Sequence, residues 1–263
     1  MSNSMLAERT SAFPTIQSTG VYRRKVLAPV VPAPADDCSS CKLRTTSFFC
    51  ALSERAGKAL DRIKRECSYP EGAYILTEGE AARGVYILCQ GRAKLLTTNS
   101  DGKTFILKLA QPGEVFGLNS VVMGTPHEIS VETLQPCRMA FIHRDDFLRF
   151  MKEDTEVCMQ VVQHLGRDCR AAYEVIRSIG LSSSASEKLA RFLVEWSSHG
   201  RITDGILRVK LALTHEEMAQ LIGCSRETVS RTLSEFKRQR YVEFSGATLV
   251  VRNRAALESL AAS

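Results

Sequence analysis

The sequence predicts an α+β protein with a β-rich N-terminal domain, one long helix, and a small C-terminal domain of helices and a hairpin. Three observations support this prediction. Short β-prone runs separated by glycines fill residues 69–142, and apolar residues repeat at heptad spacing over residues 158–179. Two helix-start signals then surround one glycine within residues 213–236. These features divide the chain into residues 1–35, 36–150, 151–181 and 182–263.

The sequence pattern of the N-terminal half changes twice. Residues 1–35 contain Ser, Thr, Pro and basic residues with little periodicity, which indicates a mobile tail. Residues 52–66 have the pattern of a short amphipathic helix. Beyond residue 69, β-prone runs alternate with glycine turns, and Asp101-Gly102 is a hairpin signal. This pattern is typical of an antiparallel sandwich or barrel. The runs are residues 73–76, 85–89, 94–97, 104–109, 129–133 and 138–142.

The composition is that of an ordinary globular protein. Of 263 residues, 44% are hydrophobic and 24% are charged, and no apolar run reaches the ~18 residues of a membrane helix. The first thirty residues lack the apolar core of a signal peptide, so we expect a cytoplasmic protein with no membrane partner. A net charge of +6 is compatible with an anionic partner without identifying one. No catalytic triad, phosphate-binding loop or carboxylate pair indicates an enzyme.

Apolar residues at alternating steps of four and three predict a long helix with a narrow seam. Three unbroken heptads are the minimum usually taken as a coiled-coil signal, so we expect this helix, within residues 151–181, to form the interface of a homodimer. The alternative is a stripe that packs against the helix's own domain. The seam comprises Cys158, Val162, Leu165, Cys169, Ala172, Ile176 and Ile179.

Residues 213–236, LTHEEMAQLIGCSRETVSRTLSEF, have the pattern of two short helices joined by a tight turn. Thr214 and Glu217 form a capping box that starts the first helix. Gly223 can adopt the left-handed conformation that ends it, and Ser225 can cap the second helix. The sequence therefore predicts a helix-turn-helix, followed by a small hairpin over residues 241–251.

The second helix of this pair has an apolar face and a charged face. Val229, Leu233 and Phe236 fall on one side at about 100° per residue. Arginine can bond guanine and glutamate can accept from cytosine, so the opposite side suits the DNA major groove. The alternative is a solvated face on a structural helix. The predicted DNA-binding residues are Ser225, Arg226, Glu227, Ser230 and Arg231, with Lys237 and Arg238 for phosphates.

The stretch IGCSRETVSR resembles the recognition helix of the CRP/FNR family, and the order of domains resembles that family over residues 50–255. The resemblance implies a β-roll (jelly-roll) sensor domain of the cyclic-nucleotide-binding type, a dimerisation helix and a winged helix-turn-helix. It also implies double-stranded DNA and RNA polymerase as partners. The oxygen-sensing branch reads DNA with E-x-x-S-R and the catabolite-activator branch with R-E-x-x-x-R. Residues 226–231 satisfy both patterns, which implies an operator with TGA-like half-sites.

The family's cyclic nucleotide cassette is altered in this chain. In the family members that this chain resembles and that bind the nucleotide, a glutamate accepts from a ribose hydroxyl and an arginine neutralises the cyclic phosphate. Leu118 and Glu128 stand at the corresponding positions here. Burying a phosphate against a carboxylate is unfavourable. We therefore expect no cyclic nucleotide.

Four cysteines resemble the cluster ligands of the family's oxygen sensors. Cys38, Cys41 and Cys50 precede the β-rich domain, and Cys137 lies before a late strand, which implies a [4Fe-4S] cluster. Eight residues separate Cys41 from Cys50, whereas the best-known members have five. A zinc site or a thiol redox switch would use the same side chains.

These patterns predict a sequence-specific, DNA-binding transcription regulator that senses oxygen, nitric oxide or redox state through the cluster. The alternatives are a regulator of the same fold that responds to a small molecule or a thiol switch, and a zinc-stabilised regulator without a cluster.

Overall fold

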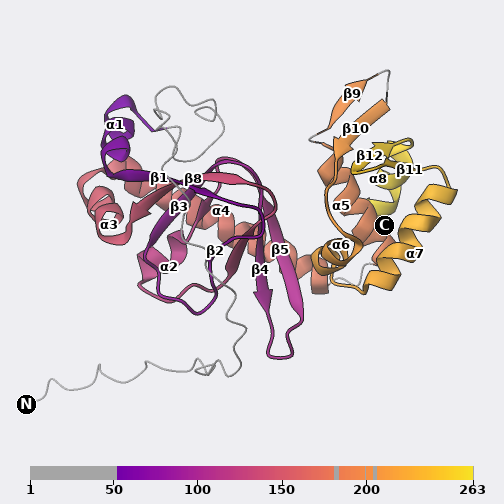
Figure 1. Cartoon of the computed structure of the whole chain (residues 1–263), viewed down its shortest axis with the longest axis horizontal. Coiled ribbons are helices and arrows are strands. Elements are labelled where there is room, and N and C mark those ends of the chain that lie inside the picture. Colours follow the sequence, from indigo (N-terminus) through magenta and orange to yellow (C-terminus); the bar gives the residue numbers. More distant parts are fainter. Residues whose placement is uncertain (1–51, 181–183, 199, 204–205, 263) are drawn as a thin grey trace, which may run out of the picture.

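The computed structural model describes residues 52–180, 184–198, 200–203 and 206–262. A β-rich domain and a smaller, mainly helical domain are joined through the long helix α4, Thr155–Gly180 (Figure 1). The predicted α+β class is confirmed. The expected mobile tail at residues 1–35 lies outside the described residues.

Eight short strands form two four-stranded antiparallel sheets with a shared core. The order is β1-β8-β3-β6 in one sheet and β2-β7-β4-β5 in the other. This is the sandwich predicted from the glycine-punctuated runs, and it has the form of the β-roll that the resemblance implied. The strands are β1 Lys64–Tyr69, β2 Tyr74–Leu76, β3 Gly84–Gln90, β4 Ala93–Thr98, β5 Thr104–Ala110, β6 Val115–Phe116, β7 Ser130–Thr133 and β8 Cys137–His143.

The first helix is shorter than the sequence pattern indicated. Helix α1 spans Glu54–Ile63, and β1 begins at once with Lys64, which pairs with Ile142 of β8. The Lys64 side chain is only 6% exposed and forms an ion pair with Asp61 at 2.7 Å. Pairing with a strand some eighty residues away therefore overrides the local helical pattern of residues 64–66.

Two apolar layers cover the faces of the first sheet. Its inner face shares a core with the second sheet, where Leu88 and Met139 lie beside Val131. Its outer face packs against helices, and Val85 and Ile142 belong to this second core. The helices that cover the outer face are α1, α2 (Leu118–Met123), α3 (Arg144–Glu153) and the first turns of α4.

Helix α4 is anchored to the β-rich domain at its start. Its first turns bury Val157 and Val161 completely. The carboxylate of Asp154, just before the helix, accepts a bond from Arg55 at 2.7 Å and one from the N–H of Glu156 at 3.0 Å. Sequence alone placed the long helix at 151–181, whereas the structure ends α3 at Glu153 and begins α4 at Thr155.

The C-terminal domain is a helical cluster with a four-stranded sheet of order β11-β12-β10-β9. The predicted hairpin is present, and β12 also pairs with β10, a strand that the sequence pattern did not indicate. Helices α5, α6 and α7 contribute Leu193, Met218 and Leu233 to one core, to which α8 adds Leu257. The elements are α5 Ala185–Ser197, β9 Arg201–Thr203, β10 Ile206–Lys210, α6 His215–Ile222, α7 Arg226–Arg238, β11 Val242–Ser245, β12 Thr248–Val251 and α8 Arg254–Ala262.

A membrane-spanning helix is absent from the described part of the chain, where no helix is both long and apolar enough.

Candidate nucleic-acid interface

Helices α6 and α7 form the predicted helix-turn-helix through local caps. The Thr214 hydroxyl accepts from the N–H of Glu217 at 3.1 Å, and the Glu217 carboxylate accepts in return from the N–H of Thr214 at 3.0 Å. Gly223 ends α6 with φ of 68°, a left-handed conformation that glycine adopts without strain. Ser225 caps α7 by accepting from the N–H of Thr228 at 3.2 Å. The helix-turn-helix is thus confirmed, and its helix ends are formed by the residues from which it was predicted.

Helix α7 places its apolar and polar faces as its periodicity predicts. Val229, Leu233 and Phe236 are at most 2% exposed and hold the helix in the domain core. Arg226 and Arg231 are exposed on the opposite side, together with Ser225 and Glu227. Neither arginine forms a hydrogen bond or ion pair with a described carboxylate, so the donors of both guanidinium groups remain available to a ligand.

The carboxylate of Glu227 is held ionised at the start of α7. Hydrogen bonds from its own backbone N–H and from the Ser225 side chain lower the pKa of Glu227, and nearby Arg226 acts in the same direction. An ionised carboxylate is an acceptor only. This group can therefore accept from a base amino group but cannot donate to one.

The basic residues at the end of α7 are already engaged within the domain. Lys237 places its ammonium group 4.9 Å from the centre of the Phe244 ring on β11. Arg238 forms an ion pair with Glu235, one turn earlier. Both side chains remain exposed, and a phosphate would have to compete with these neighbours.

Ser230 has a partner that sequence reasoning missed. Its Oγ lies 2.8 Å from Nδ1 of His215, the first residue of α6. Both residues are half-buried. No periodicity links residues fifteen positions apart on different helices, so the sequence contained no signal for this contact.

Comparison with known proteins places these features in a family. Residues 66–154 match the model of the cyclic nucleotide-binding domain, and residues 187–260 match the Crp-like helix-turn-helix domain. The chain belongs to the CRP/FNR family of transcription regulators. The regulator is not an enzyme, and it binds DNA as this family does.

Individual relatives cover most of the regulator. A CRP-like cAMP-activated global transcriptional regulator of Mycobacterium tuberculosis is 26% identical over 210 residues, which are 80% of this chain and 93% of that protein. The nitrogen fixation regulation protein FixK of Bradyrhizobium diazoefficiens is 24% identical over 227 residues, 86% of this chain and 94% of the relative. The solved structure of FixK2 from Bradyrhizobium japonicum superposes with a TM-score of 0.68 at 28% identity, covering 76% of this chain and 98% of that one.

Helix α4 of the regulator exposes an apolar stripe that includes Val162 and Ile176 of the predicted dimer seam. Large apolar residues are exposed at Met159 (55%), Val162 (58%), Tyr173 (64%) and Ile176 (63%). Leu165 instead packs partly buried against the core of its own β-rich domain. The role of these residues in a dimer interface stays a prediction. Of the other predicted interface residues, Val162, Cys169, Ala172 and Ile176 are exposed, Cys158 is half-buried, and the Ile179 side chain lies outside the described part.

The positions of the nucleotide cassette carry other interactions. Leu118 is 3% exposed and forms part of the core between the first sheet and the helices. Asn119, the next residue, donates its side-chain amide to both oxygens of Glu128 at 2.8 and 2.9 Å. The position of the ribose-binding glutamate is thus taken by a core residue, Leu118, and that of the phosphate-binding arginine by a carboxylate, Glu128, which accepts from Asn119.

Cys137 is the one predicted cluster ligand within the described residues; Cys38, Cys41 and Cys50 lie outside them. The thiol is 1% exposed and donates toward the carbonyls of Arg92 and Gln135, each at 3.2 Å. Burial raises the pKa of Cys137 to about 11. Within the described part of the chain, no three His, Cys, Asp or Glu side chains gather as a metal site.

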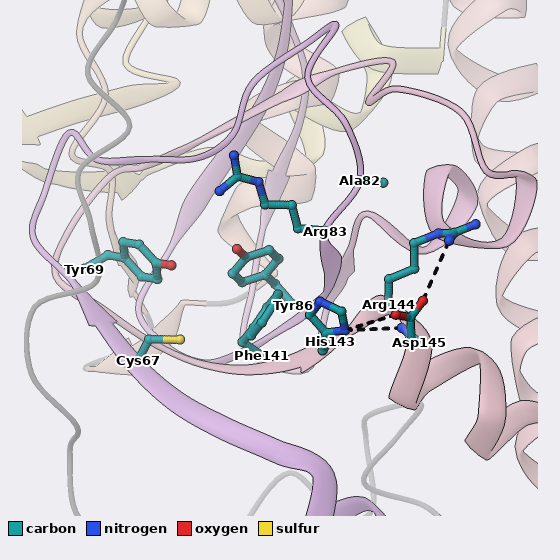
Figure 2. A pocket seen from close by; sticks show the side chains of 9 residues that line it. All are labelled: Cys67, Tyr69, Ala82, Arg83, Tyr86, Phe141, His143, Arg144 and Asp145. Atoms are coloured by element: carbon teal, nitrogen blue, oxygen red, sulfur yellow. Dashed lines mark hydrogen bonds and ion pairs between the residues drawn. The ribbon is translucent and has the colours of Figure 1, made fainter.

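A cavity of about 540 Å³ opens beside the first sheet (Figure 2). Tyr69, Tyr86 and Phe141 form an aromatic wall, with the last two rings 4.8 Å apart. The hydroxyls of Tyr69 and Tyr86 point toward each other, and burial raises the pKa of both. Burial raises the pKa of the Cys67 thiol, which lies between Tyr69 and Phe141. The remaining lining residues are Ala82, Arg83, His143, Arg144 and Asp145.

The β4–β5 hairpin touches the DNA-binding domain directly. Lys94 of β4 lies 3.0 Å from Oε1 of Glu217, the capping residue of α6, and 3.5 Å from Glu132 of its own domain. Arg92 stacks its guanidinium 4.7 Å from the ring centre of Trp196 on α5. Leu109 of β5 packs against the core of the C-terminal domain. The β-rich domain therefore contacts the helix-turn-helix at Glu217, a member of the capping box of α6.

Proposed function

We propose that the regulator reads a twofold-symmetric operator as a homodimer, with α7 of each chain in the major groove of a TGA-like half-site. One observation carries this proposal: α7 buries its apolar face, while Arg226 and Arg231 are exposed and form no ion pair with any described carboxylate. Arg231 and Arg226 can each bond guanine O6 and N7, and ionised Glu227 can accept from cytosine N4. Lys237 and Arg238 supply phosphate contacts, and RNA polymerase is the proposed protein partner.

Selection from randomised duplex DNA tests this proposal. We expect wild-type protein to enrich a palindromic site with half-sites about one helical turn apart. Arg231→Ala should weaken binding to that site by about 1–3 kcal/mol and relax selection at one base pair. Arg201→Ala is a control, because this exposed arginine lies on β9, outside the helix-turn-helix. An Arg231→Ala protein with an unchanged ratio of specific to random binding would show that α7 does not read DNA.

Two features support the proposal that the regulator does not respond to a cyclic nucleotide. A ribose hydroxyl would meet the buried side chain of Leu118, which cannot accept a hydrogen bond. A cyclic phosphate would meet the carboxylate of Glu128. Relatives named as cAMP-activated belong to the same family, so cAMP is the appropriate negative control in binding experiments.

For the signal itself, we propose that Cys38, Cys41, Cys50 and Cys137 bind a [4Fe-4S] cluster that responds to oxygen, nitric oxide or redox state. A cluster ligand is a thiolate. The described surroundings of Cys137 favour the protonated thiol, because burial raises its pKa to about 11 and outweighs the opposing backbone hydrogen bond at Arg92. Cluster binding would therefore require the segment before β8 to rearrange.

The absorption spectrum of protein purified without oxygen decides between the candidates. If a cluster is bound, the protein should be brown. The Cys137→Ala variant should be colourless, whereas the Cys224→Ala variant, changed in the turn before α7, should remain brown. A colourless protein with tightly bound zinc would favour the structural zinc alternative. A colourless, metal-free protein would leave a thiol switch or a small-molecule effector.

The aromatic cavity favours a small-molecule effector as the second candidate. Its volume lies within the range of ligand pockets, and Arg83 at its edge has no carboxylate partner among the described residues (Figure 2). An aromatic wall with an available guanidinium suits a planar aromatic anion. Benzoate should then raise the melting temperature more than benzyl alcohol does, and Arg83→Ala should remove the difference. Equal shifts with both compounds, or none, would eliminate this candidate.

A further inference from the structure

His215 joins the two helices of the helix-turn-helix through a side chain. Its Nδ1 lies 2.8 Å from Oγ of Ser230. The capping box formed by Thr214 and Glu217 fixes the first turn of α6, where His215 is the first residue. Glu217 is held in turn by Lys94 at 3.0 Å. The imidazole is therefore attached to a well-anchored turn and reaches across to α7.

The neighbouring serine on α7 shows what a hydroxyl does there without such a partner. Ser234 donates to the carbonyl oxygen of Ser230, four residues earlier, at 2.8 Å. Serine hydroxyls in helices commonly turn back in this way, and the hydroxyl is then used within its own helix. Ser230 is one turn earlier on the same helix, but its hydroxyl is bonded to His215 instead.

The partner determines what the Ser230 hydroxyl can offer to DNA. A hydroxyl has one proton and two lone pairs, and a neutral imidazole nitrogen either accepts or donates. If Nδ1 accepts, the Ser230 oxygen presents only lone pairs, which suit the amino group of cytosine or adenine. If Nδ1 donates, Ser230 keeps its proton for guanine, thymine or a phosphate oxygen.

We propose that His215 is a positioning residue for base recognition: it holds the Ser230 hydroxyl away from its own helix and sets its role as donor or acceptor. This inference rests on the proposed DNA reading by α7. In His215→Ala, the Ser230 hydroxyl should turn back to the carbonyl of Arg226, as the Ser234 hydroxyl does to the carbonyl of Ser230. The Ser230→Ala and His215→Ala proteins should then have the same defect.

A double-mutant cycle on a selected operator tests the inference. Each single substitution should weaken specific binding by about tenfold, and the double variant should be no more than about twofold weaker than the weaker single variant. His215→Ala and Ser230→Ala should relax selection at the same base pair, which loss of packing alone would not do. His215→Asn places a polar group near the position of Nδ1 and should restore much of the selectivity. Gln220→Ala, on the surface of α6, is the matched control.

The outcomes separate this inference from the function on which it rests. If the two penalties multiply, or if His215→Ala leaves selection unchanged at the base pair that Ser230→Ala relaxes, His215 does not position Ser230. Melting curves identify a variant that fails to fold, and His215→Asn then carries the test. If wild-type protein selects no sequence at all, the proposed function fails and this inference fails with it.

Discussion

Replacing Ile176 by glutamate should dissociate the homodimer. Ile176 continues an exposed stripe on α4 in which Met159, Val162, Cys169 and Tyr173 also face outward. With Gly166, these positions follow steps of three and four, the spacing of a coiled-coil seam. Family members act as dimers, and a twofold axis along α4 would bury this stripe against its copy.

The size of the effect follows from the exposed surface. Complete burial of an isoleucine side chain is worth roughly 1.5–3 kcal/mol. Ile176 is 63% exposed in the single chain, so its burial in the dimer contributes roughly 1–2 kcal/mol per chain. A twofold interface uses the residue twice, or roughly 2–4 kcal/mol per dimer. Loss of this term alone raises the dissociation constant at least about 30-fold, and two facing carboxylates raise it further.

Sedimentation over a range of protein concentrations measures the change. Ala171→Glu is the matched control, because it introduces the same charge at an exposed position on the opposite side of α4. The control should remain dimeric and bind its operator as wild type does, whereas Ile176→Glu should be monomeric and bind weakly. Identical sedimentation of Ile176→Glu and wild type would show that the exposed stripe is not the interface.

Three further predictions concern stability. Lys94→Gln should destabilise the protein by about 1–3 kcal/mol in denaturant melts, because the side chains of Lys94 and Glu217 are only 13% and 18% exposed. Lys58→Gln, which breaks the exposed Lys58–Glu54 pair, is the control and should cost less than about 0.5 kcal/mol; equal losses of stability would contradict this reasoning. Burial would raise the pKa of Glu217, but hydrogen bonds from Thr214 and Lys94 outweigh it, so the pKa lies below its ordinary value of 4.5. The stabilising contribution of this carboxylate should therefore be lost as pH falls below that ordinary value and through the lowered pKa, and Glu217→Gln should flatten the dependence of stability on pH in this acidic range. Gly91→Ala should destabilise the protein by about 1–3 kcal/mol, because φ of Gly91 is 103° and a Cβ would lie 2.5 Å from the Cys137 Sγ. Gly57→Ala, in the open interior of α1, should instead stabilise it by about 0.5–1 kcal/mol in the same thermal melts, and an unchanged stability of Gly91→Ala would contradict the steric argument.

Helix ends and turns were predictable because they depend on neighbours within a few residues. The capping box of α6 and the serine cap of α7 occur where the sequence placed them. The same holds for the two faces of α7, since an apolar stripe at helical spacing must be buried. The hairpin around Asp101-Gly102 is likewise present, between Thr98 of β4 and Thr104 of β5.

Predictions that depended on distant parts of the chain fared differently. The helix expected to reach residue 66 ends at Ile63, because β8 pairs with the following residues. The dimer seam on α4 stays a prediction, because it was derived from spacing alone and spacing cannot tell which of two adjacent stripes faces the β-rich domain. Leu165 and Val161 face that domain, and Met159 and Tyr173, which the spacing argument left out, are exposed.

The sequence by itself determined the family, the order of the domains and the polar face of α7, because each depends on a pattern of residues close together in the chain. Only the tertiary structure decided that Lys94 holds Glu217, that His215 holds Ser230, and that Leu118 is a core residue. Each of these depends on which surface of one element is covered by another. A one-dimensional pattern records which residues share a face, but the partner of that face is set by the packing of the whole chain.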